Sequence, residues 1–206
     1  MKKKIAVAVS LLLVLALSVG GTIAWLTDSD SVTNTFTIGK VDITLNETTG
    51  NSYKIMPGRV TAKNPVVTVV GNSENSYVFI KIEKLNGAVT YTPAGTETPV
   101  TTSFGDFISF SVNEEWKTAT GLPDGVYYQE YTSQQDNKTY QVLGEKTTTD
   151  GTDGSKGAVE IPNSVTMEMI TALKNSQKNP ELKITAYAIQ KEGTGTVTEA
   201  WAKLNH

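Results

Sequence analysis

Cysteine is absent from the 206 residues, and histidine occurs once, as His206. Without cysteine the chain forms no disulfide, so its stability has to come from packing and strand pairing. A cysteine nucleophile, a serine paired with an internal histidine and the two histidines of an HExxH zinc motif are all excluded. There is also no Gly-rich loop opening a helix to bind phosphate. We therefore expect no catalytic residues, no metal site and no cofactor, and a protein that is not an enzyme.

Grouped basic residues are also lacking beyond the N-terminus. The chain has 18 Lys and Arg against 21 Asp and Glu, a net charge of −3, and its single arginine is Arg59. Nucleic-acid phosphates are bound by clustered Lys and Arg, so nucleic acid is excluded as a partner. Adjacent carboxylates such as Glu114 and Glu115 would point to opposite faces of a strand and could not converge as glycosidase carboxylates do.

The long apolar run, residues 5–19, is shorter than the about 20 residues that a membrane span needs. Three lysines precede it and two glycines follow it, which is the pattern of a secretory signal peptide. Signal peptidases cut after small or short residues, and Thr22 and Ala24 occupy the −3 and −1 positions of a cut between Ala24 and Trp25. We predict a signal peptide over residues 1–24, with an uncleaved signal anchor as the alternative. No cysteine for a lipid anchor and no LPxTG-type sorting motif follows.

The rest of the chain is rich in Thr, Val and Tyr, with turn residues at short intervals. This composition predicts a mainly β chain, folded as a jelly-roll-like β-sandwich with one or two short helices. Apolar residues occupy even positions up to Ile38 and odd positions from Val41, so Gly39 marks a bulge or a break. That change of phase separates an N-terminal arm, residues 25–38, from a jelly-roll domain, residues 39–206.

Several segments alternate apolar and polar residues, as strands with one buried face do. The loop at residues 133–137 predicts a hairpin between the strands on either side of it. Two segments are expected to turn an apolar set inward, Ile108, Phe110 and Val112 in one and Leu182, Ile184, Ala186 and Ala188 in the other. The expected strands are residues 41–45, 65–70, 77–85, 107–112, 125–132, 138–143, 158–161 and 181–189.

In two other segments the apolar residues lie three or four positions apart, as on one face of a helix. Residues 163–175 predict a helix capped by Asn163 or Ser164, with an apolar face made by Val165, Met169, Ala172 and Leu173. Residues 196–204 predict a second helix, in which Thr196 and Glu199 form a capping box. Its apolar face consists of Val197, Ala200, Trp201 and Leu204, and we expect Trp201 to pack against the sandwich.

Two stretches rich in Thr, Gly and Pro, residues 92–103 and 145–157, are expected to be solvated loops. The second contains Asp150 and Asp153. It lacks the spacing and the distal glutamate of an EF-hand, so we do not predict a calcium site there.

The sequence resembles the TasA/camelysin family of Gram-positive secreted proteins. The likeness rests on the aromatic residue after the expected cut, on "TD", "NTF" and "GKVDITL", and on Pro57-Gly58, the "NP" before a Val-rich strand and "YVFIKIE". The C-terminal "ELKITAYAIQKEG" and "EAW" are also similar. The resemblance covers residues 1–85 and 180–202, whereas residues 86–161 carry no family signature.

This resemblance implies export with the help of a dedicated ER-type signal peptidase and assembly into fibres of the extracellular or biofilm matrix or the cell surface. In such fibres the arm of one subunit completes the sheet of the next by donor-strand exchange. Strand addition satisfies the backbone groups of a sheet edge while apolar side chains fill a groove. The partner is then a second copy in a head-to-tail homopolymer, with accessory matrix or anchor proteins as further partners. The assembly residues would be Trp25, Leu26, Val32, Phe36 and Ile38.

Three alternatives stay open on the sequence. In the first, the arm folds back on its own subunit as an ordinary edge strand. In the second, the protein is a monomeric surface adhesin or carbohydrate-binding module, which requires exposed aromatics, the candidates being Tyr127, Tyr128, Tyr131 and Tyr140. The camelysin name also implies a secreted metalloprotease, although the sequence offers no ligand set for one.

Overall fold

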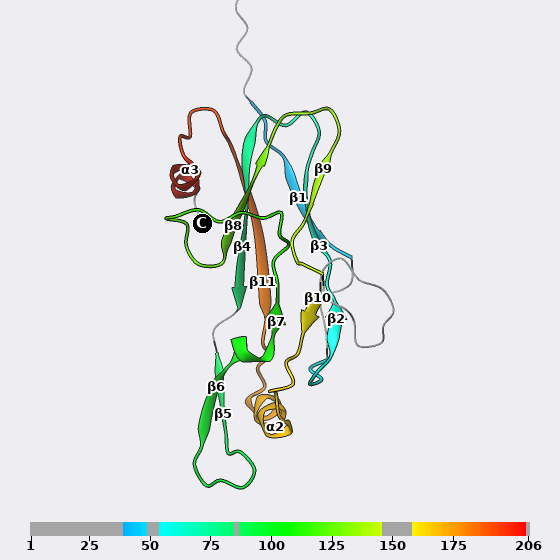
Figure 1. Cartoon of the computed structure of the whole chain (residues 1–206), viewed down its shortest axis with the longest axis vertical. Coiled ribbons are helices and arrows are strands. Elements are labelled where there is room, and N and C mark those ends of the chain that lie inside the picture. Colours follow the sequence, from blue (N-terminus) through cyan, green and yellow to red (C-terminus); the bar gives the residue numbers. More distant parts are fainter. Residues whose placement is uncertain (1–38, 49–53, 85–86, 146–157, 205–206) are drawn as a thin grey trace, which may run out of the picture. The chain divides into compact units, whose positions relative to one another are not determined.

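The computed structural model describes residues 39–48, 54–84, 87–145 and 158–204 (Figure 1). The chain divides between Ile38 and Gly39, and every described residue belongs to the second unit, residues 39–206. This unit is built mainly from antiparallel strands with short helices, which confirms the expected mainly β class.

Three sheets of three strands and one hairpin make up the described β structure, and we name each sheet by its central strand. The β3 sheet has the order β1 (Ile43–Glu47), β3 (Pro65–Val69), β9 (Lys138–Gln141). The β4 sheet has the order β11 (Leu182–Gln190), β4 (Ser76–Lys84), β8 (Val126–Tyr131). The β10 sheet has the order β2 (Val60–Ala62), β10 (Ala158–Glu160), β7 (Ser109–Phe110). The hairpin joins β5 (Ala88–Tyr91) to β6 (Val100–Ser103).

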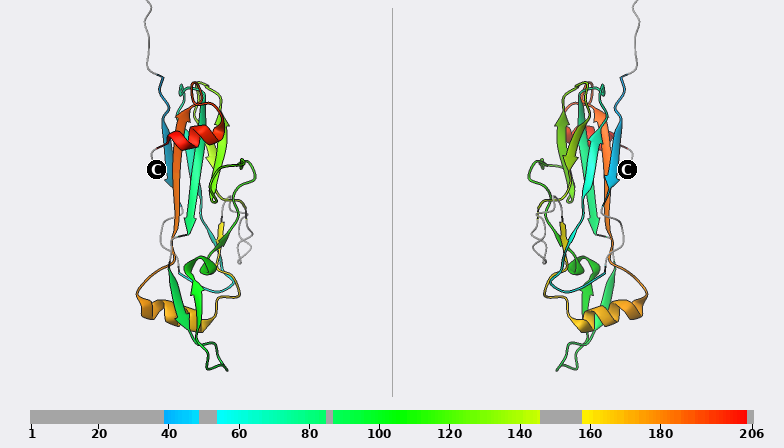
Figure 2. Two further views of the ribbon diagram at one scale, coloured as in Figure 1. Left: turned by 90° about the vertical axis from the view of Figure 1, so that its left-hand side faces the viewer. Right: turned by 90° about the vertical axis from the view of Figure 1, so that its right-hand side faces the viewer.

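The β3 and β4 sheets face each other across the main hydrophobic core (Figure 2). Strict alternation along each strand creates it, because every second side chain points to the same face of a sheet. Val67 and Val69 enter from β3, whereas Val78 and Ile80 enter from β4, and all four are fully buried. The expected inward set of β11 packs against the same core, which confirms that part of the sequence analysis: Leu182, Ile184, Ala186 and Ala188.

The outer face of the β4 sheet is covered at one end by the C-terminal helix α3 (Val197–Lys203). Trp201 is only 4% exposed, and its ring centroid lies 5.2 Å from that of Phe79 and 5.4 Å from that of Tyr187. The predicted capping box is confirmed, since the Thr196 backbone N–H donates to Glu199 Oε2 at 2.7 Å. This hydrogen bond holds the pKa of the Glu199 carboxyl below its usual range.

A second cluster lies under α2 (Met167–Ser176), the β5–β6 hairpin and the 3-10 helix η1 (Phe104–Phe107). The predicted apolar face of α2 is confirmed, but its cap is Thr166, whose side chain accepts from the Met169 N–H at 3.3 Å. Asn163 and Ser164 are instead part of a turn closed by the Val165 N–H and the Pro162 carbonyl. No helix in the described part of the chain has the length and apolarity needed to cross a membrane.

The predicted hairpin across residues 133–137 is wrong. Strand β8 pairs with β4, whereas β9 pairs with β3, so the connection passes from one sheet to the other. Tyr131 at the end of β8 and Tyr140 in β9 are both buried in the main core. The two strands therefore face each other across the core and do not lie side by side.

The strand expected at residues 107–112 is also largely wrong. Residues 104–107 form η1, whose first turn is capped by Ser103 and Asp106, and only Ser109 and Phe110 belong to a strand. Ile108 packs in the cluster under α2, whereas Phe110 and Val112 pack against the main core. The expected loop at residues 92–103 contains β6, and Glu114 and Glu115 are exposed in a turn, not on a strand.

We expect Trp201→Ala to lower the free energy of unfolding by about 3–5 kcal/mol, because truncation of a buried aromatic leaves a cavity. The measurement is urea denaturation followed by far-UV circular dichroism. Ala202→Ser, at an exposed position of the same helix, is the matched control and should change the free energy by less than about 1 kcal/mol. Equal effects of the two changes would contradict the packing role of Trp201.

Candidate functional site

The predicted cleavage residues Ala24 and Trp25 and the predicted assembly residues Leu26, Val32, Phe36 and Ile38 lie outside the described residues. Their roles therefore stay predictions. What the structure describes is the surface that such an arm would have to meet.

The four tyrosines proposed for a ligand-binding surface do not form an exposed group. Tyr131 and Tyr140 are buried in the main core, and Tyr127 packs against the same core. Tyr128 packs in the aromatic cluster under α3. These four side chains therefore do not form the exposed aromatic surface that such a module requires.

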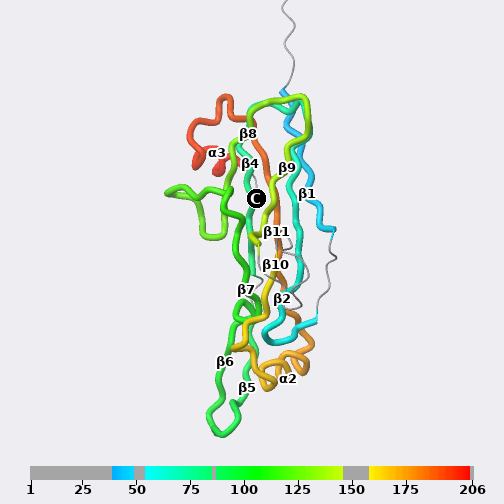
Figure 3. The backbone as a smooth tube through the Cα atoms, turned by 45° about the vertical axis from the view of Figure 1, so that its right-hand side comes forward, coloured from blue at the N-terminus to red at the C-terminus, as the bar shows by residue number. Residues whose placement is uncertain are grey.

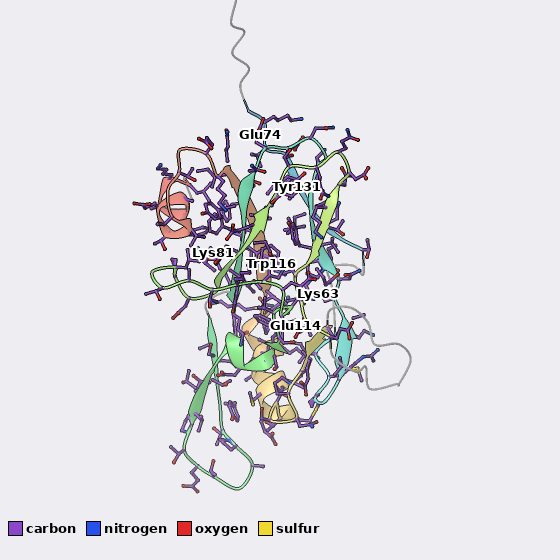
Figure 4. The ribbon with its side chains drawn as sticks, turned by 45° about the horizontal axis from the view of Figure 1, so that its top comes forward. Lys63, Glu74, Lys81, Glu114, Trp116 and Tyr131 are labelled. Carbon is purple, nitrogen blue, oxygen red and sulfur yellow. The ribbon has the colours of Figure 1, made fainter. Side chains whose placement is uncertain are left out.

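One side of the sandwich, where β8 and β9 are the edge strands, is closed by residues 112–117. The Lys117 and Tyr128 backbones exchange hydrogen bonds of 3.0 and 2.8 Å. The Trp116 indole N–H donates to the Gln141 carbonyl at 2.8 Å, and the Asn113 N–H donates to the Val142 carbonyl at 3.0 Å. Figure 4 labels Trp116 and Tyr131 on this side. The segment thus supplies partners to Tyr128 on β8, to Gln141 on β9 and to the two residues that follow β9.

On the other side, the edge strands are β1 of the β3 sheet and β11 of the β4 sheet, and they run close to each other (Figure 2). Strand β2 is an edge of the β10 sheet. A groove of about 820 Å³ is lined by residues from β2, from β10, from α2 and from the start of β11. We call it the β2–β11 groove, and Figure 3 shows the elements that form it.

The lining of the β2–β11 groove follows from local periodicity. Thr61 and Lys63 are two residues apart at β2, and Val159 and Ile161 are two apart at β10, so each pair shares a face. On α2, the lining residues Ile170, Leu173 and Lys174 are three and four positions apart and so lie on one face of the helix. The apolar lining residues are Ile55, Met56, Ile108, Val159, Ile161, Ile170, Leu173, Pro180 and Leu182, and the polar ones are Lys54, Thr61, Lys63, Lys174, Asn179 and Glu181.

An ion pair fixes one wall of this groove. Lys63 Nζ lies 2.9 Å from Glu47 Oε2, and the Asn64 N–H donates to Glu47 Oε1 at 2.9 Å. The side chains of Lys63 and Glu47 are only 14% and 20% exposed. The pair joins the end of β1 to the β2–β3 connection and leaves Lys54 and Lys174 as the exposed lysines of the groove.

Comparison with known families shows to which family the chain belongs. The family described as camelysin metallo-endopeptidase matches residues 1–113, more than half of the sequence. The chain belongs to the camelysin family. The match confirms the predicted TasA/camelysin resemblance and extends past residue 85, whereas the C-terminal likeness lies outside it. No curated protein and no solved structure matches the chain.

The description of the camelysin family implies a metal ion, which can be tested against the side chains present. Within the described ranges, no group of three or more His, Cys, Asp or Glu side chains could hold one. The sole histidine, His206, lies outside those ranges. The described residues of this camelysin-family chain do not fit a metal centre.

Sequence reasoning did not find the groove. Its lining residues come from four separated segments, and local patterns assign only Ile108, Leu173 and Leu182 among its apolar members to a buried face. Lys54, Thr61 and Lys63 carry no local signal, because their common location depends on the pairing of β2 with β10.

We expect Glu47→Gln to lower the free energy of unfolding by about 1–3 kcal/mol, because Lys63 would keep a charge in a largely buried position without its carboxylate. Urea denaturation measures the change. Asp42→Asn is the matched control, since Asp42 pairs with Lys40 at 2.9 Å where both side chains are well exposed, and it should cost less than about 0.5 kcal/mol. A cost for Glu47→Gln no larger than that of Asp42→Asn would refute the structural role of the pair.

Proposed function

We propose that this camelysin-family protein is a secreted structural subunit of extracellular or cell-surface fibres. In this proposal a signal peptidase removes residues 1–24, and residues 25–38 of one subunit add to the sheet of the next. The observation that carries the proposal is the asymmetry of the sandwich. Residues 112–117 give backbone partners to the β8 and β9 edges, whereas β11 and β2 are edge strands beside an apolar groove.

Strand addition explains how such a subunit polymerises. A donor strand gains backbone hydrogen bonds along an edge, and its alternate side chains enter a groove. Because donor and acceptor are different surfaces, the contact is head-to-tail and does not have to close, which produces filaments. Trp25 and Leu26 would each contribute about 2 kcal/mol from buried apolar area.

We expect protein that begins at Trp25, with no tag at that end, to form filaments with a regular subunit repeat in negative-stain electron microscopy. Deletion of residues 25–38 should give monomers in analytical ultracentrifugation with an unchanged far-UV circular dichroism spectrum. Monomers at high concentration from the protein beginning at Trp25, over a range of pH and salt, would contradict the proposal.

We further propose that the protein has no protease activity, because neither the sequence motifs nor the side-chain clusters of the described segments support one. The check is digestion of casein by the purified protein, with and without added zinc and with and without a chelator. We expect no cleavage under any of these conditions. Cleavage that zinc stimulates and the chelator abolishes would instead assign the protein to the proteases.

A further inference from the structure

We propose that a depression between β5 and α2 binds an amino-sugar chain, with Tyr91 stacking on the sugar rings and Glu168 pairing with their free ammonium groups. The depression shares no lining residue with the β2–β11 groove, and the inference does not rest on the proposed fibre. Three observations carry it: the polar face of α2, the chemistry of the lining side chains and the exposed apolar residues next to Tyr91.

Helix α2 has a polar face beside the hairpin. Glu168, Thr171 and Asn175 are three and four positions apart, so they lie along one side of the helix. Together with residues 90–92 of the hairpin they line a depression of about 530 Å³, which is within the about 300–1,000 Å³ typical of ligand pockets. Figure 1 shows the hairpin and α2 next to each other. Ala172 also lines the depression, and its short side chain leaves the middle of the helix face open.

The lining groups match those of a saccharide. Hydroxyl and amide side chains both donate and accept hydrogen bonds, as sugar hydroxyls do. In the described part of the chain, the Tyr91 hydroxyl and the Asn175 side-chain amide bond to no other residue, so both are available to a ligand. The Thr171 hydroxyl donates to the Met167 carbonyl at 2.8 Å, and its oxygen can still accept. Tyrosine adds a flat apolar ring with a polar tip, which suits the apolar face and polar edge of a sugar ring.

The charge of the depression selects an amino sugar. Among the described residues that line it, Glu168 carries the only charge, so a phosphate or an acidic sugar would meet a carboxylate and no cation. Hydrogen bonds from its own backbone N–H and from the Thr166 hydroxyl hold the pKa of the Glu168 carboxyl below its usual range. The carboxylate is therefore ionised at neutral pH and provides a partner for an ammonium group.

Tyr91 has exposed apolar neighbours. In the hairpin it is paired directly with Val100, which is 42% exposed, and Met167, which lines the same depression, is 66% exposed. Of the three large apolar side chains that are exposed in the described segments, two therefore adjoin Tyr91. Such a group of exposed apolar side chains marks a binding surface more often than a single one does. Here it gives the apolar faces of the sugar rings a surface to pack on.

A basic peptide is the competing ligand, because a lysine side chain would also pair with Glu168. The lysine side chain is a flexible apolar stem with a single ammonium group at its end. It offers no hydroxyl to Thr171 or Asn175 and no rigid ring to Tyr91. The amino sugar satisfies the carboxylate, the polar face of α2 and the aromatic ring together, and we therefore assign the site to it.

The test is isothermal titration calorimetry of protein that begins at Trp25, at about 0.15 M ionic strength so that unspecific attraction is screened. The ligands are a glucosamine oligomer, an N-acetylglucosamine oligomer of equal length, in which acetylation removes the positive charges, and tetralysine. We expect the glucosamine oligomer to bind at least about fivefold more tightly than either of the other two. Glu168→Gln should bring the affinities for the two sugars to within about twofold of each other. The matched control is Glu192→Gln, which removes one carboxylate at an exposed position outside the depression and should leave the preference unchanged.

The role of the aromatic ring is tested separately. Tyr91→Ala should weaken the binding of both sugars by at least about tenfold, whereas Tyr91→Phe keeps the ring and should stay within about threefold of the unsubstituted protein. Tyr91 also packs partly in the cluster under α2, so the fold of each variant is checked by circular dichroism. If Tyr91→Ala does not fold, Asn175→Ala decides, because Asn175 is exposed: it should weaken binding by at least about threefold with an unchanged spectrum.

Each result counts for or against the site. No binding of either sugar, or affinities that the changes at Tyr91 and Asn175 leave unaltered in folded protein, would overturn it. A preference for the glucosamine oligomer that persists in Glu168→Gln would overturn the pairing with the ammonium groups. Tetralysine binding as tightly as the glucosamine oligomer would reassign the depression to basic peptides. None of these measurements depends on filament formation, so the fibre proposal stands or falls separately.

Discussion

The fold depends on strand β4, which is buried on both of its faces and paired along both of its edges. Val78 and Ile80 enter the main core, while Tyr77 and Phe79 on the opposite face lie under α3. β11 and β8 pair with its two edges along most of its length. A chain without disulfides has to gain its stability from such burial. Where α3 ends, the outward residues change to Lys81 and Glu83, so the sequence of β4 itself limits the area that the helix must cover.

The local elements were largely predictable, because their signals are local. Alternation identified β4 and β11, and the capping box with its apolar stripe identified α3. The pairing of strands was not predictable in the same way. The residues between Tyr131 and Tyr140 give no sign that the two tyrosines enter one core from opposite sheets. That depends on β4 and β3, which lie far earlier in the sequence. The cap of α2 was misplaced because Asn163 and Ser164 belong to a turn, and the Thr166 side chain accepts from the Met169 N–H instead.

The two sides of the sandwich manage their edges differently. On the β8 and β9 side, residues 112–117 provide backbone pairing, and the Trp116 indole N–H donates a hydrogen bond to the Gln141 carbonyl. This arrangement occupies some of the edge groups that could otherwise pair with another chain. On the other side, the Lys63–Glu47 ion pair fixes β1 to the β2–β3 connection and so gives the groove a rigid wall. In the proposed filament, partners on one side and a groove on the other would favour a single direction of strand addition.

Binding of an arm in the groove would also stabilise the subunit that receives it. Val159, Ile170 and Leu182 are only partly buried in the isolated domain, so an inserted strand would remove further apolar surface from water. A ligand that binds the folded state alone raises its stability by mass action, and in a filament the neighbouring subunit is present at a high local concentration. Assembly would thus supply part of the stabilisation that disulfides provide in other exported proteins. In the proposed filament, a chain of this kind could remain free of cysteine because its neighbours would complete its packing.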